Sequence, residues 1–340
     1  MHALITGGAG FIGSHLAEKL LSKGYEVTII DDLSTGSNSN INHLKPNRSF
    51  RYVIDTVMER AVLAELVDDC DIVFHLAAAV GVQLVVQSPV RTMHTNIRGT
   101  ELVLEAAAKK GKKVVITSTS EVYGKSNRIP FREDDDLLIG PPVFSRWSYA
   151  CSKAIDEFLA LSYHREFHLP VVIVRLFNTV GPGQIGTYGM VLPRFVSAAL
   201  DGRPIEIYGD GFQARCFGWV GDVVSALSKL GENHQAEGRV FNIGSDEEVT
   251  INGLAELVRD VVRSNSPVVH RSYKEVYGQE FEDMARRVPD LSRIRDLIGY
   301  APTKTLRQIV ETVADHLQTA HASHIPHLQQ DQIGAAASAD

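Results

Sequence analysis

The sequence predicts an α/β protein with a doubly wound parallel sheet, followed by a smaller α/β domain. Through the first half of the chain, Val- and Ile-rich runs alternate with helix-like segments. Near-continuous apolar strands that alternate with helices are typical of a parallel sheet covered on both faces. After about residue 177 glycine and proline become frequent, which indicates loops and short elements built on the carboxyl edge of that sheet.

The strand-like runs are, in order, Ala3–Ile5, Val27–Ile30, Arg51–Ile54, Asp71–Leu76, Val114–Ile116 and Val171–Arg175. The helix-like segments between most of them are Ser14–Ser22, Arg60–Val67, Thr95–Lys110 and Tyr149–Phe167. In the first of these helices the leucines recur at helical spacing and share one face. The third helix has two lysines in its last turn before a glycine, a favourable helix end. A later run, Arg239–Ile243, is strand-like enough to return to the main sheet.

These segments predict three regions. Residues 1–177 form the first domain, to which about 215–245 returns, and residues 178–318 form the second. Residues 319–340 are rich in Ala, Gln, Ser and His and are expected to be a disordered tail. His321, His324 and His327 recur in that tail, but Pro326 and the lack of cysteine favour a solvated segment, so no metal site is expected.

Composition excludes several partners. The balance of 34 basic and 41 acidic residues gives a net charge of −7, which argues against nucleic acid and anionic membranes. No apolar run approaches the roughly 20 residues of a membrane span, and the N-terminus lacks the features of a signal peptide. Cys70, Cys151 and Cys216 match no zinc or disulfide pattern. A cytoplasmic protein is expected.

A glycine-rich loop joins the first strand to the first helix. In TGGAGFIG the glycines Gly7, Gly10 and Gly13 have the spacing GxxGxxG. Gly7 makes a tight turn, Gly10 lets backbone N–H groups approach a pyrophosphate, and Gly13 lets the helix pack closely on the strand. This loop, with Phe11 and Ile12 between its glycines, predicts a Rossmann-type dinucleotide site.

Acidic residues at the ends of the next strands indicate which dinucleotide binds. Asp31 ends the second strand, where a carboxylate accepts hydrogen bonds from ribose hydroxyls and repels a 2′-phosphate. Asp32 follows, and the segment Leu33–Asn40 contains no Arg or Lys. NAD is therefore favoured over NADP. Asp55, at the end of the third strand, is a candidate partner of the adenine amino group or, alternatively, a helix N-cap.

Tyr149 and Lys153 in YACSK are four residues apart and share one helix face. A lysine ammonium near the phenol lowers its pKa from roughly 10, so that the phenolate can remove a proton from a sugar or alcohol hydroxyl. The hydroxyl-rich stretch TSTSEVYG, Thr117–Gly124, follows a predicted strand and would supply the hydrogen-bonding groups beside this pair.

Together, TGGAGFIG, Asp31, FHLAA, Asn96, STSEVYG and YACSK resemble the extended short-chain dehydrogenase/reductase family over roughly residues 1–318. The resemblance implies a Rossmann domain that holds NAD and a smaller substrate-binding C-terminal domain for a sugar nucleotide. It also implies a homodimer, formed through a four-helix bundle from the helices near 95–110 and 150–166.

The resemblance implies roles for individual residues. Tyr149 is the base, Lys153 holds the nicotinamide ribose, Thr119 bonds the 4-hydroxyl of the sugar, and Asn96 positions a helix. Leu76 and Ala77 of FHLAA would also contact the cofactor. In the second half, Asn178 resembles a phosphate ligand, Arg215 and Arg287 resemble arginines that clamp the diphosphate or uridine, and Asp283 lies where an acid meets the uridine ribose.

Relatives of this family diverge after forming a 4-keto sugar. Dehydratases carry Asp then Glu after the threonine, where this chain has Ser120 and Glu121, so dehydration is not expected. UDP-glucuronate decarboxylases carry Thr-Ser-Glu, as this chain does. Ser120 is then a candidate substrate ligand, and Glu121 a candidate catalytic residue that could instead be structural or bind a sugar hydroxyl.

The helix after the GP loop argues against a uronate. Decarboxylases have an arginine where this chain has Met190, next to Val191. Burying a carboxylate against a thioether costs several kcal/mol, although Arg194 lies one turn away. The leading hypothesis is therefore a UDP-hexose 4-epimerase of the UDP-glucose/UDP-galactose type, with a UDP-glucuronate decarboxylase as the alternative. A non-catalytic NAD-binding regulator is a minor alternative, because both Tyr149 and Lys153 are present.

Overall fold

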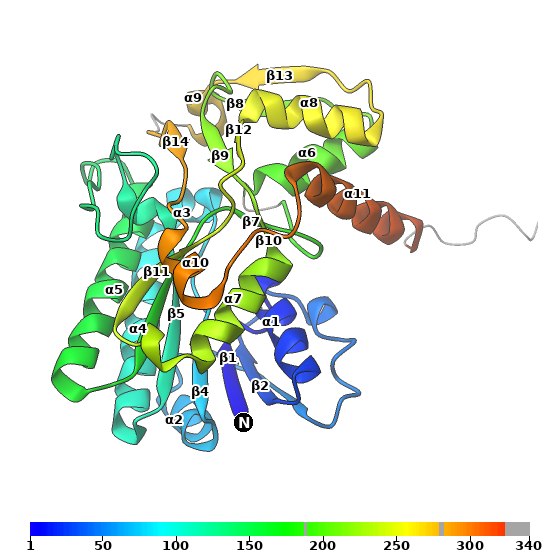
Figure 1. Cartoon of the computed structure of the whole chain (residues 1–340). Coiled ribbons are helices and arrows are strands. Elements are labelled where there is room, and N and C mark those ends of the chain that lie inside the picture. Colours follow the sequence, from blue (N-terminus) through cyan, green and yellow to red (C-terminus); the bar gives the residue numbers. More distant parts are fainter. Residues whose placement is uncertain (187–188, 279–281, 324–340) are drawn as a thin grey trace, which may run out of the picture.

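The computed structural model describes residues 1–186, 189–278 and 282–323. A seven-stranded sheet forms its centre (Figure 1), with all neighbouring strands parallel and the order β11-β6-β5-β4-β1-β2-β3. Its strands are β1 (His2–Thr6), β2 (Glu26–Asp31), β3 (Phe50–Ile54), β4 (Ile72–His75), β5 (Lys113–Thr119), β6 (Val171–Leu176) and β11 (Arg239–Ile243). The predicted doubly wound sheet is confirmed, including the return of Arg239–Ile243, which pairs with β6.

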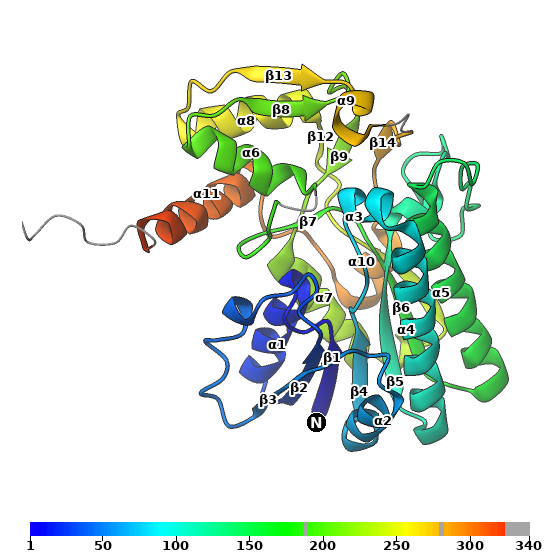
Figure 2. The same ribbon diagram turned by 180° about the vertical axis from the view of Figure 1, so that it is seen from behind.

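Helices cover both faces of the sheet, as Figures 1 and 2 show from opposite sides. On one face lie α1 (Phe11–Ser22), α7 (Val220–Glu232) and α10 (Ser292–Ile298), and on the other lie α2 (Arg60–Asp69), α4 (Pro89–Lys110) and α5 (Trp147–Phe167). Successive strand residues feed the two cores, since Ile5 packs in the first and Leu4 in the second. Burial on both faces explains why these strands read as continuous apolar runs.

A smaller domain lies above the carboxyl edge of the sheet in Figure 1. Its core includes Phe195, Leu254 and Val310, from the helices α6 (Val191–Leu200), α8 (Ile251–Val262) and α11 (Leu306–Ser323). The short strands are β7 (Thr179–Val180), β8 (Ile205–Tyr208), β9 (Ala214–Cys216), β10 (Gly218–Trp219), β12 (Glu248–Thr250), β13 (Val268–Arg271) and β14 (Arg286–Arg287). The remaining elements are α3 (Val82–Gln87), α9 (Tyr273–Tyr277) and 3₁₀ turns at Asn38–Asn40, Ser120–Tyr123 and His234–Ala236.

Several helix boundaries differ from the sequence predictions. α4 begins at Pro89, not Thr95, because proline suits the first turn of a helix. α11 continues to Ser323, into the segment predicted to be a disordered tail. His324, His327 and the rest of 324–340 lie outside the described residues, as does the side chain of His321.

Two structural features bear on the membrane and metal expectations. In the described part of the chain, no helix is long and apolar enough to cross a bilayer. Among the same residues, no group of three or more His, Cys, Asp or Glu side chains is arranged to hold a metal ion.

Candidate active site

A cavity of about 570 Å³ lies at the carboxyl edge of the sheet and extends to the smaller domain. The strand order reverses between β1 and β4, and ligands of open α/β sheets bind at such a point. The cavity is lined by most of the residues singled out above: Gly7, Gly10, Phe11, Ile12, Gly13, Asp31, Asp32, Asp55, Leu76, Ala77, Thr119, Ser120, Glu121, Tyr149, Lys153, Asn178, Met190, Val191, Arg194, Arg215, Asp283 and Arg287.

The glycine loop leaves no room for side chains. A Cβ on Gly13 would lie 2.2 Å from the carbonyl oxygen of Gly7, and Gly7 itself has a φ of +71°. α1 begins directly after this loop, with no capping side chain and no acid in its first turn. Its N-terminal N–H groups therefore remain available to an anion. The loop and helix start fit the pyrophosphate of a dinucleotide.

Asp31 is buried and faces the cavity from the end of β2. Its carboxylate accepts hydrogen bonds from the backbone N–H groups of Ala9 (2.9 Å) and Leu33 (2.8 Å), which fix it beside the glycine loop. Burial raises the pKa of Asp31, although these N–H groups oppose the shift. Such an anchored carboxylate fits the adenosine ribose of NAD and disfavours a 2′-phosphate.

Two other predicted cofactor residues have different environments. Asp55 lines the cavity, and its carboxylate accepts from the N–H of Thr56; it is not the N-cap of α2, which is Glu59. Asn96, which the resemblance gave a helix-positioning role, is buried outside the cavity lining. Its amide bonds Ala79 (2.8 Å) and the Ser152 hydroxyl (3.2 Å), so it ties the loop after β4 to α5.

Tyr149 and Lys153 project into the cavity from one face of α5. The Lys153 ammonium is buried and donates to Oδ2 of Asp156 at 2.7 Å. The expected lowering of the Tyr149 pKa is not found. Burial raises that pKa, and the carboxylates of Glu121 and Asp156 add to the rise, against the Thr119 hydroxyl and Arg287. Lys153 is already paired with a carboxylate, which weakens its effect on the phenol.

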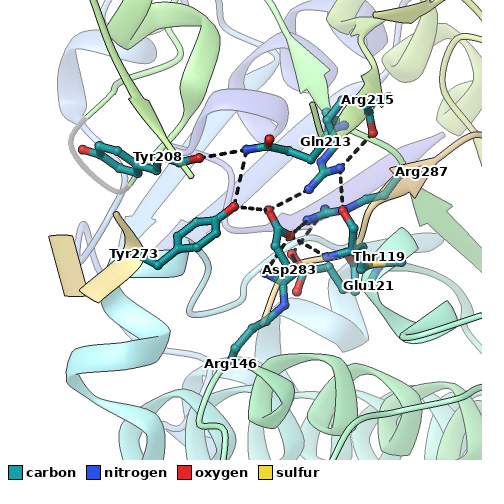
Figure 3. Close-up of polar contacts among 12 residues, drawn as sticks. Thr119, Glu121, Arg146, Tyr208, Gln213, Arg215, Tyr273, Asp283 and Arg287 are labelled. Atoms are coloured by element: carbon teal, nitrogen blue, oxygen red, sulfur yellow. Dashed lines mark hydrogen bonds and ion pairs between the residues drawn. The ribbon is translucent and has the colours of Figure 1, made fainter. Parts of the chain in front are cut away.

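Five charged side chains form a cluster beside Tyr149 (Figure 3), which we call the charge cluster: Glu121, Arg146, Arg215, Asp283 and Arg287. The Glu121 carboxylate lies 3.6 Å from Arg146 and 3.3 Å from Arg287. Asp283 lies 3.0 Å from Arg146, 2.8 Å from Arg215 and 3.5 Å from Arg287. Three guanidinium groups face two carboxylates.

Asp283 is the centre of the charge cluster. Although burial favours the neutral acid, the three arginines lower the pKa of Asp283 to about 2, and the Tyr273 hydroxyl also donates to it at 3.2 Å. Most of the hydrogen-bonding capacity of Arg215 is used within the protein. It donates to the carbonyl oxygens of Ala214 and Met284, both at 2.8 Å, and to Asp283.

Sequence reasoning missed Arg146. This residue is only 3% exposed, lines the cavity and precedes α5. Its position three residues before Tyr149 was a signal, since Arg146 and Tyr149 are then one helical turn apart. Its two acidic partners, Glu121 and Asp283, come from other parts of the chain, and nothing in the sequence pointed to their pairing with Arg146.

The remaining predicted substrate residues lie where the smaller domain meets the sheet. Asn178 donates from its amide to the carbonyl oxygen of Cys216 at 3.2 Å. Met190 is half-buried at the start of α6. The guanidinium of Arg194 stacks on Tyr208, with 3.9 Å to the ring centroid.

Known proteins resemble this chain over most of its length. The model of the NAD dependent epimerase/dehydratase family matches residues 3–244. A UDP-N-acetyl-alpha-D-glucosaminuronate decarboxylase of Bacillus cytotoxicus is 41% identical over 313 residues, which cover 91% of this chain and 96% of that protein.

Solved structures of the same fold include epimerases. The UDP-glucuronic acid 4-epimerase of Bacillus cereus, in complex with UDP-glucuronic acid and NAD, has a TM-score of 0.85 and 28% identity. The UDP-glucose 4-epimerase of Thermotoga maritima, with UDP-glucose, has the same two values. Each comparison covers 94% of this chain and 100% of the other.

Replacement of Gly13 by alanine tests the dinucleotide loop. The new Cβ would overlap the backbone of Gly7 and Gly8, so α1 would be displaced, and we expect Gly13→Ala to weaken NAD binding at least about tenfold. Titration calorimetry measures the affinity. Gly99→Ala in α4 is the control, because its Cβ would meet only a Val57 methyl at 3.3 Å. Unchanged NAD affinity in Gly13→Ala would contradict this account of the loop.

Proposed function

Since this chain belongs to the NAD dependent epimerase/dehydratase family of extended short-chain dehydrogenases/reductases, its cofactor is NAD, and we propose that it decarboxylates a UDP-linked uronate. The first substrate to consider is UDP-N-acetylglucosaminuronate, because the 41% identical relative bears that name. The observation that carries the proposal is the charge cluster beside Tyr149.

The charge cluster suits a substrate carboxylate. With three arginines and two carboxylates it carries one excess positive charge, and its members are largely buried. Arg146 and Arg287 both contact Glu121, and the charges of Glu121 and Arg287 act on Tyr149. Members of the charge cluster therefore lie near the reacting end of the substrate. A buried cation favours an anionic group there over a neutral hydroxymethyl group.

This arrangement also answers the objection raised by Met190. From the sequence alone, a uronate carboxylate is expected to face Met190 and to lack a partner. Met190 does line the cavity, but Arg146 and Arg287 line it too, so a carboxylate has cationic partners that do not depend on α6. Met190 is therefore no reason to exclude a uronate substrate.

The chemistry follows from the placement of the side chains. Bound NAD would accept the hydride of C4 and later return it. Tyr149 takes the proton of the 4-hydroxyl, with Thr119 orienting that hydroxyl. The 4-keto group is then β to the carboxylate, so the C5–C6 bond breaks and CO2 leaves. The electron pair of that bond passes into an enolate. C5 takes up a proton from solvent, and Tyr149 returns its proton to the 4-oxygen.

The ion pairs within the charge cluster weaken its binding of the substrate carboxylate. A carboxylate held too tightly in the ground state would raise the barrier to losing CO2, because its negative charge leaves the carboxyl group in the transition state. Glu121 and Asp283 already neutralise most of the arginine charge, so the substrate carboxylate is attracted without being held by a full set of free cations.

A 4-epimerase, the leading hypothesis from the sequence, is the second candidate. It would use the same Tyr149 and the same 4-keto intermediate, and the two epimerases named above share the fold over 94% of this chain. We rank it below the decarboxylase because identity to those epimerases is 28%, against 41% to the Bacillus cytotoxicus decarboxylase.

Product analysis decides between the two reactions. The protein is incubated with UDP-N-acetylglucosaminuronate, UDP-glucuronate or UDP-glucose, each labelled with ¹³C at C6, and followed by NMR. We expect ¹³CO2 and a UDP-pentose from at least one uronate and no conversion of UDP-glucose. Tyr149→Phe is the inactive control. Conversion of UDP-glucose to UDP-galactose, or a 4-epimer that keeps its labelled carboxylate, would make the chain an epimerase.

Replacement of Arg287 by methionine tests carboxylate recognition. Loss of this guanidinium leaves two carboxylates against two arginines, so we expect UDP-glucuronate to bind at least about tenfold more weakly and UDP-glucose to be affected much less. Calorimetry in a Tyr149→Phe background measures both affinities without turnover. Arg286→Met is the matched control, since that neighbour is exposed and paired with Glu248. Equal losses for both ligands would argue against a carboxylate site.

The predicted homodimer is also a proposal. α4 and α5 pack side by side (Figure 2), and α5 leaves Phe158 65% exposed and Ile155 38% exposed. Two copies of this helix pair could bury these side chains in a four-helix bundle.

We expect Phe158→Asp to convert a dimer to a monomer, measured by light scattering after size exclusion. Phe212→Asp is the control, because Phe212 is similarly exposed but lies in the smaller domain. A wild-type monomer at micromolar concentration would refute the dimer.

A further inference from the structure

Asp156 is a buried carboxylate that none of the roles above uses. Tyr149, Lys153 and Asp156 stand at i, i+4 and i+7, so they form one stripe along α5. Asp156 is 0% exposed, and its Oδ2 accepts a hydrogen bond from the Lys153 ammonium at 2.7 Å. Because a buried ion is costly without a partner, this pair holds both side chains in place.

Lys153 is the counter-charge of Asp156, because the other charged groups nearby are paired elsewhere or neutral. Its neighbour Glu157 is engaged by Arg175 at 2.7 Å and also accepts from Ser118. Burial raises the pKa of Asp156, and the Lys153 ammonium and the Thr100 hydroxyl of α4 oppose that rise by favouring the ionised form.

The nearby His75 of β4 supplies no positive charge. Burial, together with the charge of Lys153, lowers the pKa of His75 to about 3. The neutral ring is held between the hydroxyls of Thr6 (2.8 Å) and Thr100 (3.1 Å).

We propose that Asp156 is a positioning residue of the active site: as the fixed counter-charge of Lys153, it orients the ammonium and cancels its field at the Tyr149 phenol. The remaining charges that act on Tyr149 come from other elements, with Glu121 after β5 opposing the phenolate and Arg287 of β14 favouring it. With Lys153 neutralised, these charges do not favour ionisation, and the phenol stays protonated.

The consequence concerns when the base becomes active. An oxidised nicotinamide ring carries the additional positive charge that the phenolate then requires. Proton removal is thereby confined to enzyme that holds its oxidised cofactor. The inference rests on the proposed function only in taking Tyr149 as the base, and the ionisation of that phenol is measurable without turnover.

The test follows Tyr149 directly. Full-length protein is labelled with ¹³C at the tyrosine Cζ, saturated with NAD and titrated by NMR without substrate, and Tyr149→Phe identifies the resonance. Loss of the negative charge in Asp156→Asn stabilises the phenolate, so we expect the Tyr149 pKa to fall by roughly one unit. The acid limb of the kcat/KM profile should move to lower pH by the same amount, because that limb reports the base.

Three further variants make the test decisive. Asp156→Asn leaves Lys153 unpaired and could fail to fold, whereas Lys153→Gln with Asp156→Asn removes both charges together. If the two charges cancel at Tyr149, this double variant titrates like the wild type, while Lys153→Gln alone has a higher Tyr149 pKa. Glu166→Gln, the same change at an exposed position of α5, should leave the titration unaltered.

A Tyr149 pKa that is unchanged in Asp156→Asn would overturn the proposal, as would a double variant that titrates like Lys153→Gln. Shifted titrations in a protein that turns over no UDP-sugar would instead contradict the proposed function and leave the role of Asp156 intact.

Discussion

The parallel pairing of β1 with both β2 and β4 is the constraint on which the site depends. It places the carboxyl ends of β1, β2 and β4 at one edge of the sheet. From β1 the strand order continues in opposite directions, to β2 and β3 on one side and to β4 and β5 on the other. The glycine loop leaves from β1, and Asp31 stands at the end of β2. Since a glycine loop can bind a pyrophosphate only if α1 starts directly above the strand, the missing Cβ of Gly13 makes this geometry possible.

What could be predicted from the sequence is what short segments encode. Strands buried on both faces are readable as apolar runs, the GxxGxxG spacing identifies a loop, and Tyr149 with Lys153 share a helix face by spacing alone. These local patterns need no knowledge of the rest of the chain. Asn96 shows the limit, since its motif implied that it positions a helix, but only the folded structure shows that its amide ties Ala79 to Ser152.

The electrostatics could not be predicted in the same way. The charge cluster combines a turn after β5, the start of α5 and the segment around β14, and only folding brings Glu121, Arg146 and Asp283 together. The raised pKa of Tyr149 has the same origin, because it depends on burial and on the carboxylates of Glu121 and Asp156. Local spacing gave Lys153 as a neighbour of the phenol, but it did not reveal that the lysine charge was already paired.

The position of β11 affects the order in which the sheet can be completed. β11 forms the edge beside β6, yet the chain first passes through β7, α6, β8, β9, β10 and α7 before it returns. During synthesis the edge of β6 therefore stays unpaired until Arg239–Ile243 has emerged, and an open strand edge is a site for pairing with other chains. A chain that ended before Arg239 would keep the glycine loop and Tyr149 but would carry a permanently open edge. Such a fragment would also lack Asp283 and Arg287 of the charge cluster, but aggregation is the first defect expected of it.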